Sequence, residues 1–308
     1  MKPSRVAHRR LRLRTAAQQA HAADAAQHRS NRGGLPSGGV AWLPLACRWR
    51  RWAAQLMRKP LGRAEAKLIA KLVVWNTEWA LPSSRRGQII LEQILAEDPD
   101  VLCLTESVTD FPPACGYAVA SAPDYGYRRA RPDRRKVILW SREPWQHVDS
   151  VGAAGLPSGR FVEASTRTPV GTLFVTGVCV PWRDAHVRTG RQDRRPWEDH
   201  MAFLNAVAPL IRRPRTSPAL LAGDFNQRVP PLRIPAQAAG ALARVLEPMR
   251  LATEGKIPGL GVQSIDHVAL SRDLFVQSVQ GLPTVHAGIP LSDHPGIVVC
   301  FGVPESAA

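Results

Sequence analysis

Residues 68–301 alternate between short apolar runs and polar segments, which predicts a domain of mixed α/β class. Short apolar runs bounded by turn residues are typical of buried strands. Three longer segments carry apolar residues at helical spacing, and Ser83 or Ser84 is expected to cap the first of these helices. The expected strands are 68–75, 101–104, 117–120, 137–140, 160–164, 173–180, 219–223, 264–270, 274–279 and 297–301, and the expected helices are 84–97, 196–212 and 236–249.

Residues 1–66 differ in composition from the rest of the chain. They hold 14 Lys or Arg and 2 Asp or Glu, a net charge of +12, whereas the remainder holds 27 and 23, a net charge of +4. We expect a basic, disordered segment over 1–66 and one catalytic domain over 67–308. The segment resembles an organellar transit peptide, or equally sequence that precedes a true start at Met57. The basic charge of the whole chain is therefore weak evidence for a nucleic-acid ligand.

Cysteine usage points to a reducing compartment. The five cysteines are odd in number and form no C-x-x-C pair, which argues against a disulfide framework and a zinc site. We therefore expect a cytoplasmic protein, and a monomer is favoured. No stretch reaches the roughly 18 uninterrupted apolar residues of a membrane-spanning helix.

Polar side chains follow the apolar runs in the same way at several places along the chain. Each could be a turn residue that bonds its own backbone. Sheets, however, gather functional residues at strand ends, and residues two apart on extended backbone point to the same side. The set therefore predicts a site for a polar oxygen, such as that of water or phosphate. Its members are Asn76, Glu106, Asp224 with Asn226, Asp266, and Asp293 with His294.

Residues 68–303 resemble the endonuclease/exonuclease/phosphatase superfamily, because they carry its motifs in its order. The resemblance implies a four-layered α/β/β/α sandwich, in which two mixed sheets face each other and helices cover the outside. It also implies hydrolysis of a phosphate ester by in-line attack of water. The matching stretches are Trp75-Asn76, Leu104-Thr105-Glu106, Gly223-Asp224-Phe225-Asn226, Ile265-Asp266-His267-Val268 and Ser292-Asp293-His294.

The resemblance further implies a divalent cation in the site. Glu106 would hold the ion, with Asn76 close by and Asp293 as a further ligand. Oxygen ligands suit Mg²⁺ or Mn²⁺, and the sequence shows no Cys/His cluster of the kind that holds zinc. The cation would neutralise a phosphate oxygen and the charge that develops on the leaving group.

The other motif residues would carry the proton chemistry. Asp224 would activate the attacking water or protonate the leaving oxygen, and Asn226 would orient Asp224 and donate to the phosphate. His294 would act on the phosphoryl group or as the general base. Asp266 would bond one imidazole nitrogen of His294 and so fix which nitrogen faces the reaction.

Cys179 departs from the family pattern, because many relatives carry a His or Tyr there that contacts the phosphate. A thiol is a poor hydrogen-bond donor, so either Cys179 belongs to the core or another residue supplies the donor. We hypothesise that His186 or Arg183, in the Arg-rich loop that follows, replaces it. Trp182 at the edge of this loop suits stacking on a base. The alternative is an exposed loop whose charges pair with each other.

A nucleic-acid phosphodiester is the expected substrate, because arginines beside aromatic residues suit a phosphate backbone with stacked bases. A second basic run, residues 128–136, could line the opposite rim of the site. The alternative is a small-molecule or lipid-headgroup phosphate ester, which the mild charge of the domain keeps open. A non-catalytic binding module on the same scaffold is a further alternative, disfavoured because the acids, the amides and the final Asp-His pair are all present.

Overall fold

The computed structural model describes residues 68–127 and 131–304. The basic segment over 1–66, the start proposed at Met57 and part of the basic run over 128–136 lie outside these residues. No helix in the described part of the chain is long and apolar enough to cross a membrane. The described residues form two six-stranded sheets, a two-stranded hairpin and three helices.

Both large sheets contain parallel and antiparallel strand pairs. The first sheet has the order β11 (Phe275–Leu282), β14 (Gly296–Gly302), β1 (Ile69–Asn76), β2 (Val101–Val108), β4 (Arg134–Ser141), β3 (Tyr117–Ala120). The second has the order β5 (Gln146–Asp149), β6 (Phe161–Thr168), β7 (Gly171–Cys179), β8 (Ala219–Asp224), β10 (Asp266–Ser271), β9 (Met249–Leu251). The hairpin joins β12 (Val285–His286) to β13 (Ile289–Pro290).

The alternation of side chains along β1 explains why the sheets form layers. Successive side chains on a strand point to opposite faces, and here both faces are apolar. Leu72 and Val74 pack into a core shared by the strands of both sheets. Val73 and Trp75 point the other way and pack against helix α3 (Arg85–Ala96). The first sheet is thus buried on both sides at β1.

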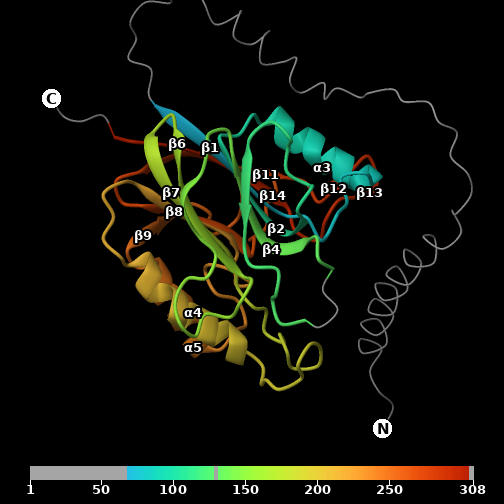
Figure 1. The fold of residues 1–308 in the computed structure, drawn as a ribbon, viewed down its shortest axis with the longest axis vertical. Helices are drawn as coiled ribbons and strands as arrows, with labels where there is room; N and C mark the ends of the chain where they lie inside the picture. Colours follow the sequence, from blue (N-terminus) through green and yellow to red (C-terminus); the bar gives the residue numbers. More distant parts are fainter. Residues whose placement is uncertain (1–67, 128–130, 305–308) are drawn as a thin grey trace, which may run out of the picture. The chain divides into compact units, whose positions relative to one another are not determined.

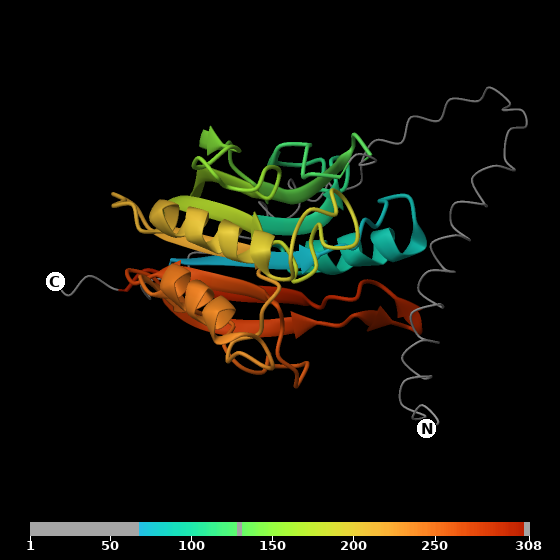
Figure 2. The same ribbon diagram turned by 90° about the horizontal axis from the view of Figure 1, so that it is seen from below.

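Helices cover the two outer faces (Figure 1). Ser84 caps α3 by accepting a hydrogen bond from the backbone N–H of Gly87, and Ile90 and Ile94 pack on the first sheet. Helices α4 (Glu198–Ile211) and α5 (Ala236–Leu246) lie next to each other (Figure 2). Both belong to a third apolar cluster on the outer face of the second sheet. The predicted α/β/β/α sandwich is confirmed.

Strand pairing brings the predicted polar residues to one end of the two sheets. Strands β1 and β2 are parallel, with Asn76 opposite Thr105, and β7 and β8 are parallel, with Cys179 opposite Asp224. Strand β10 runs antiparallel to β8, so that its first residue, Asp266, pairs with Asp224.

Two expectations differ from the structure. The second strand continues past Leu104 to Val108, so that Glu106 lies within β2 rather than after it. The short strands β5, β9, β12 and β13 were not expected, because their exposed or half-buried residues form no apolar run.

Candidate active site

A pocket of about 240 Å³ lies at this end of the sheets. Seven of the predicted site residues line it, and Asp266 lies behind His294. The lining residues are Asn76, Glu106, Lys136, Arg160, Cys179, Trp182, Asp224, Asn226, Asp293 and His294.

The carboxylate of Asp224 is buried at the end of β8 and accepts hydrogen bonds from three amide groups. The backbone N–H of Asn226 donates to Oδ1 at 2.9 Å, and the side-chain Nδ2 of Asn226 donates to Oδ2 at 3.0 Å. Nδ2 of Asn76 lies 3.4 Å from the same Oδ2. Burial, followed by the charge of Asp266, raises the pKa of Asp224 to about 7. Asp224 is therefore fixed in position and poised to exchange a proton near neutral pH.

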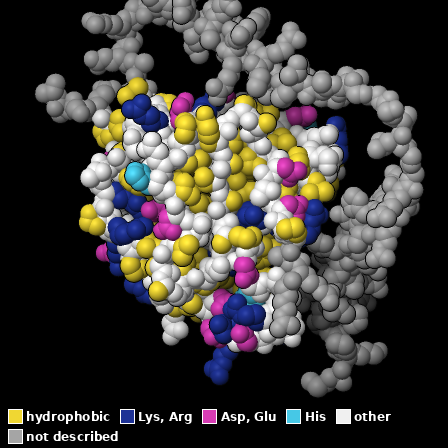
Figure 3. Space-filling view, viewed as in Figure 1, with side chains coloured by type: hydrophobic (Ala, Val, Ile, Leu, Met, Phe, Trp, Pro, Cys, Tyr) yellow, Lys and Arg dark blue, Asp and Glu magenta, His cyan; other side chains and the backbone are white. Residues whose placement is uncertain are grey.

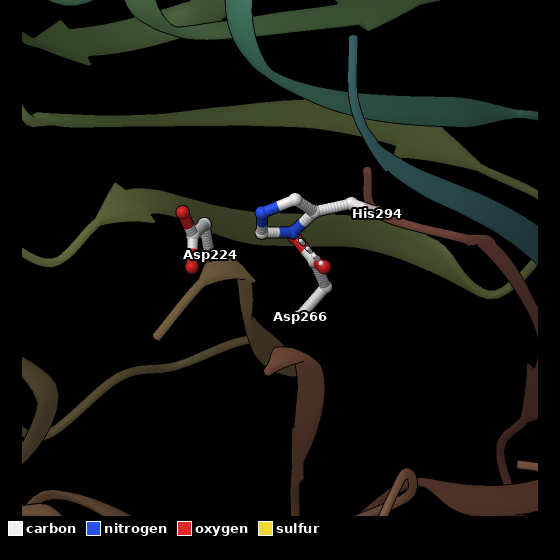
Figure 4. Close-up of side chains that lie close together, drawn as sticks. All are labelled: Asp224, Asp266 and His294. Carbon is white, nitrogen blue, oxygen red and sulfur yellow. Dashed lines mark hydrogen bonds and ion pairs between the residues drawn. The ribbon is translucent and has the colours of Figure 1, made fainter. Parts of the chain in front are cut away.

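His294 is oriented by a buried carboxylate. Its Nδ1 lies 2.6 Å from Oδ2 of Asp266, and the backbone N–H of Asp266 donates in turn to Oγ of Ser264. Burial lowers the pKa of His294, but the charge and hydrogen bond of Asp266 outweigh it and raise the pKa to about 10. Because Nδ1 is bonded to Asp266, Nε2 is the nitrogen left to act; Figure 4 shows it pointing toward Asp224.

Glu106 is locked by both its backbone and its side chain. Its φ of 47° lies in the left-handed region, which is unusual for a residue with a side chain. Two donors from the loop after β1 hold its carbonyl, the side-chain hydroxyl of Thr77 at 2.9 Å and the backbone N–H of Trp79 at 2.7 Å. Nζ of Lys136, on the neighbouring strand β4, donates to Oε1 at 2.5 Å. Burial raises the pKa of Glu106, but the charge and hydrogen bond of Lys136 outweigh it and lower the pKa.

Arg160 brings a buried guanidinium to the pocket where sequence reasoning expected none. Its Nη1 donates to the backbone carbonyl of Cys179 at 3.3 Å and lies 4.0 Å from the sulfur. Cys179 itself is almost fully buried, and burial raises the pKa of its thiol to about 12, so the sulfur is neutral. Arg160 therefore offers a charged donor beside the residue that lacks one. Its place at the start of the strand predicted over 160–164 gave no sign of this role.

Of the three residues predicted from the Arg-rich loop, the structure places only Trp182 at the pocket, with 46% of its surface exposed. His186 is buried instead: its ring lies 4.6 Å from that of Tyr127, and its Nδ1 accepts from the backbone N–H of Arg191. Arg183 pairs with Asp184 at 2.7 Å. The hypothesis that His186 or Arg183 replaces the missing donor therefore loses its geometric basis.

The basic residues of the loop have acidic partners in the helix that follows it. Arg194 donates to Asp199 at 2.7 Å, and Arg191 lies 3.4 Å from the same carboxylate. Asp199 lies in the first turn of α4, where negative charge is favoured. These pairs hold much of the loop's basic charge against the helix.

The oxygen donors in the pocket fit a hard divalent cation. Mg²⁺ typically binds through one or two carboxylates and keeps several waters. Glu106 has one oxygen not bonded to Lys136, and Asp293 has a side chain that is 70% exposed at the pocket. Asn76 is less available, because its Oδ1 already accepts from the backbone N–H of Glu78.

A second group of possible ligands consists of Asp224, Asp266 and His294, whose candidate ligand atoms lie within 4.8 Å of one another (Figure 4). Within it, Nδ1 of His294 and Oδ2 of Asp266 already bond each other. This group is therefore better suited to proton transfer, and Glu106 with Asp293 to the cation.

A buried network of hydrogen bonds lies next to the site and connects it to the helices. Nδ1 of His200 donates to the carbonyl of Pro181 at 2.7 Å, and its Nε2 lies 2.5 Å from the side-chain amide of Gln227, from which it accepts. The amide of Gln227 also donates to the carbonyl of Ala238 in α5. Because Gln227 directly follows Asn226, the network ties the site to α4 and α5.

His200 should make the stability of the protein depend on pH. Burial lowers its pKa from 6.5 to about 4. Between these values the unfolded chain binds a proton that the folded chain does not. The stabilisation is thus complete above pH 6.5 and falls by up to about 3 kcal/mol as the pH drops to 4. We expect urea unfolding of the wild type and His200→Gln to differ in free energy by an amount that shrinks over this range. Parallel curves would contradict the assignment.

Comparison with known proteins places these features in a family. The model of the Endonuclease/Exonuclease/phosphatase family matches residues 73–294. Among curated proteins no match was found. An endonuclease/exonuclease/phosphatase from Beutenbergia cavernae is 18% identical over 78% of this chain and 73% of its own, with a TM-score of 0.54.

Two further solved structures share the fold. An AP endonuclease from Archaeoglobus fulgidus is 18% identical, covering 75% of this chain and 98% of its own, with a TM-score of 0.54. A 3'-5' exonuclease from Neisseria meningitidis is 18% identical, covering 74% and 98%, with a TM-score of 0.54. At this identity the likeness concerns the fold.

Proposed function

Since the chain belongs to the endonuclease/exonuclease/phosphatase family, we propose that it hydrolyses phosphodiester bonds with the help of a divalent cation, and that its substrate is a nucleic acid. One observation carries the proposal. The amide-held carboxylate of Asp224 lies opposite the Asp266–His294 pair, in a pocket that also holds Glu106 and Arg160. A site of this kind can bind an anion and activate a water molecule.

The geometry supports a role for each polar group. Asp224 takes a proton from water as the water oxygen bonds to phosphorus. The P–O ester bond breaks, its electron pair leaves with the ester oxygen, and this oxygen takes up a proton from solvent. Asn226 and Asn76 keep Asp224 in place through their amides. His294 donates from Nε2 to a phosphoryl oxygen while Asp266 holds Nδ1.

Charge in the rest of the pocket completes the scheme. Arg160 donates to the phosphate where Cys179 cannot. Glu106, with Asp293, would hold Mg²⁺ or Mn²⁺, which when bound neutralises a phosphate oxygen and the charge on the leaving oxygen.

Trp182 is the feature that favours a nucleic acid over a small ester. It lies at the rim of the pocket with much of its indole exposed, where a base next to the reacting phosphate could stack. The face shown in Figure 3 offers no continuous basic surface, since its Lys and Arg side chains lie in separate groups beside acidic ones. We also propose a cytoplasmic location, which the buried free thiols of Cys103 and Cys179 fit.

The test compares a short single-stranded DNA or RNA with a model diester that has no base, each with Mg²⁺, Mn²⁺ or EDTA. We expect metal-dependent cleavage of the nucleic acid. Trp182→Ala should raise KM for it about tenfold, because stacking on an aromatic side chain is worth roughly 1–3 kcal/mol per base. The same variant should leave hydrolysis of the model diester unchanged.

Tyr117→Ala is the matched control. Tyr117 is exposed to a similar extent and pairs with Ser141, at the end of β4 away from Lys136. Its removal should change the hydrolysis of neither substrate. Cleavage of the small diester alone would instead favour a small-molecule or lipid-headgroup substrate. No hydrolysis of either ester with any metal would refute the enzymatic proposal and favour a binding module.

A further inference from the structure

The cation site contains a competing charge that belongs to the protein. Nζ of Lys136 lies 2.5 Å from Oε1 of Glu106, the carboxylate best suited to hold the metal. The side chain of Lys136 is only 11% exposed and that of Glu106 only 24%. For comparison, the Lys71–Glu97 pair has a distance of 3.4 Å and exposures of 30% and 22%. The pair in the pocket is thus closer, and its lysine is the more deeply buried.

Lys136 is also confined by aromatic rings. Its Nζ lies 5.1 Å from the ring centre of Trp79 and 5.3 Å from that of Tyr125. An ammonium over an aromatic face is attracted by the ring, more strongly where water is excluded. The two rings stack on each other at 6.0 Å. Together with Glu106 they keep the positive charge where it is.

A divalent cation on Glu106 would have to share the carboxylate with this ammonium. Like charges a few ångströms apart repel, and the repulsion is large where burial reduces screening by solvent. A phosphate that enters the pocket changes the balance, because its oxygens offer the ammonium another partner. Metal and phosphate would then each make binding of the other easier.

From this geometry we propose that Lys136 competes with the metal for Glu106, and that a phosphodiester relieves the competition by taking over the ammonium. Metal binding is weak in the free protein and becomes tight only with the ester present. The inference rests on the proposed function and adds a coupling between metal and substrate. Such couplings typically change affinity by about 5- to 150-fold and act equally in both directions.

The experiment measures binding of Mn²⁺ by electron paramagnetic resonance, with and without dimethyl phosphate, so that no turnover is needed. We expect Lys136→Met to bind Mn²⁺ at least about tenfold more tightly than the wild type when no ester is present. Dimethyl phosphate should tighten Mn²⁺ binding to the wild type and have little effect on Lys136→Met. Lys136→Arg, which keeps the charge, should bind as weakly as the wild type.

Lys71→Met is the matched control, because it removes a second partly buried lysine–glutamate pair of the described residues and the same net charge. It should leave Mn²⁺ affinity unchanged. Equal or weaker Mn²⁺ binding by folded Lys136→Met would overturn the inference, as would a wild-type affinity that does not respond to the ester. If Mn²⁺ binds and Glu106→Gln abolishes binding, these outcomes leave the proposed function intact. If no variant binds Mn²⁺, the inference and the metal-dependent function both fail.

Discussion

Replacing Asp224 with Asn is expected to lower metal-dependent phosphodiester hydrolysis by about 10²- to 10⁴-fold, the usual contribution of a positioned acid or base. The amide has nearly the shape of the carboxylate, so the pocket should keep its form. It cannot take the proton from water. The loss should appear in kcat rather than KM, because the contacts proposed for the phosphate come from Arg160 and His294.

The stability of Asp224→Asn should move in the opposite direction. Burial is the main cause of the raised pKa of Asp224, which means that the folded protein is destabilised by ionisation of this carboxylate. A neutral amide avoids that cost, and its oxygen can still accept from the side-chain amides of Asn226 and Asn76, so that only the acceptor for the backbone N–H of Asn226 is lost. We therefore expect a Tm equal to or above that of the wild type, as is common where function requires a destabilising group.

Single-turnover kinetics with calorimetry on the same samples checks both parts. Asp273→Asn is the control. Asp273 is exposed and comes just after the last residue of β10, whereas Asp266 is the first residue of that strand. It should keep wild-type rates. If Asp224→Asn retained more than a tenth of the activity, Asp224 would not be the group that activates water, and His294 would become the better candidate.

The layers of the fold could be predicted because the apolar positions along a strand indicate which of its faces are buried. β1 is apolar at successive positions, as expected for a strand buried on both faces. The motif residues at strand ends were likewise readable, since Asp224 and Asn226 interrupt an apolar run at a glycine. To predict that these residues come together, it was enough to assume that the strands lie side by side and that the ends carrying the motifs are at the same edge of the sheets.

Lys136 and Arg160 could not be placed in the pocket from the sequence. Their positions depend on which strands are neighbours and in what register. Lys136 faces Glu106 because β4 runs antiparallel to β2 with Val137 opposite Thr105. The basic run around Lys136 predicted only a charged rim. For His186 the sequence predicted a donor to the phosphate, but it could not show that packing against Tyr127 buries the ring.

Gly223, the residue before Asp224, is expected to be the least replaceable glycine of the site. Its φ is +136°, and a Cβ built there would lie 1.9 Å from the carbonyl oxygen of Val178 on β7. That atom belongs to backbone in the parallel pairing of β7 with β8, so no side chain can move aside. Gly223→Ala should therefore force the two strands apart and displace Asp224.

We expect Gly223→Ala to lower the free energy of unfolding by roughly 3 kcal/mol or more, since backbone strain and overpacking each cost about 1–3 kcal/mol. Activity should fall about 100-fold even in the folded fraction, because a shift of about 1 Å in a catalytic group is enough. Gly171→Ala is the control: its φ is +92°, but nothing lies within 4 Å of its added Cβ. It should cost only the about 1–2 kcal/mol of a left-handed residue and leave activity intact. Denaturant unfolding and rate measurements on both variants separate the two costs; equal midpoints would show that close approach of β7 to β8 does not fix Asp224.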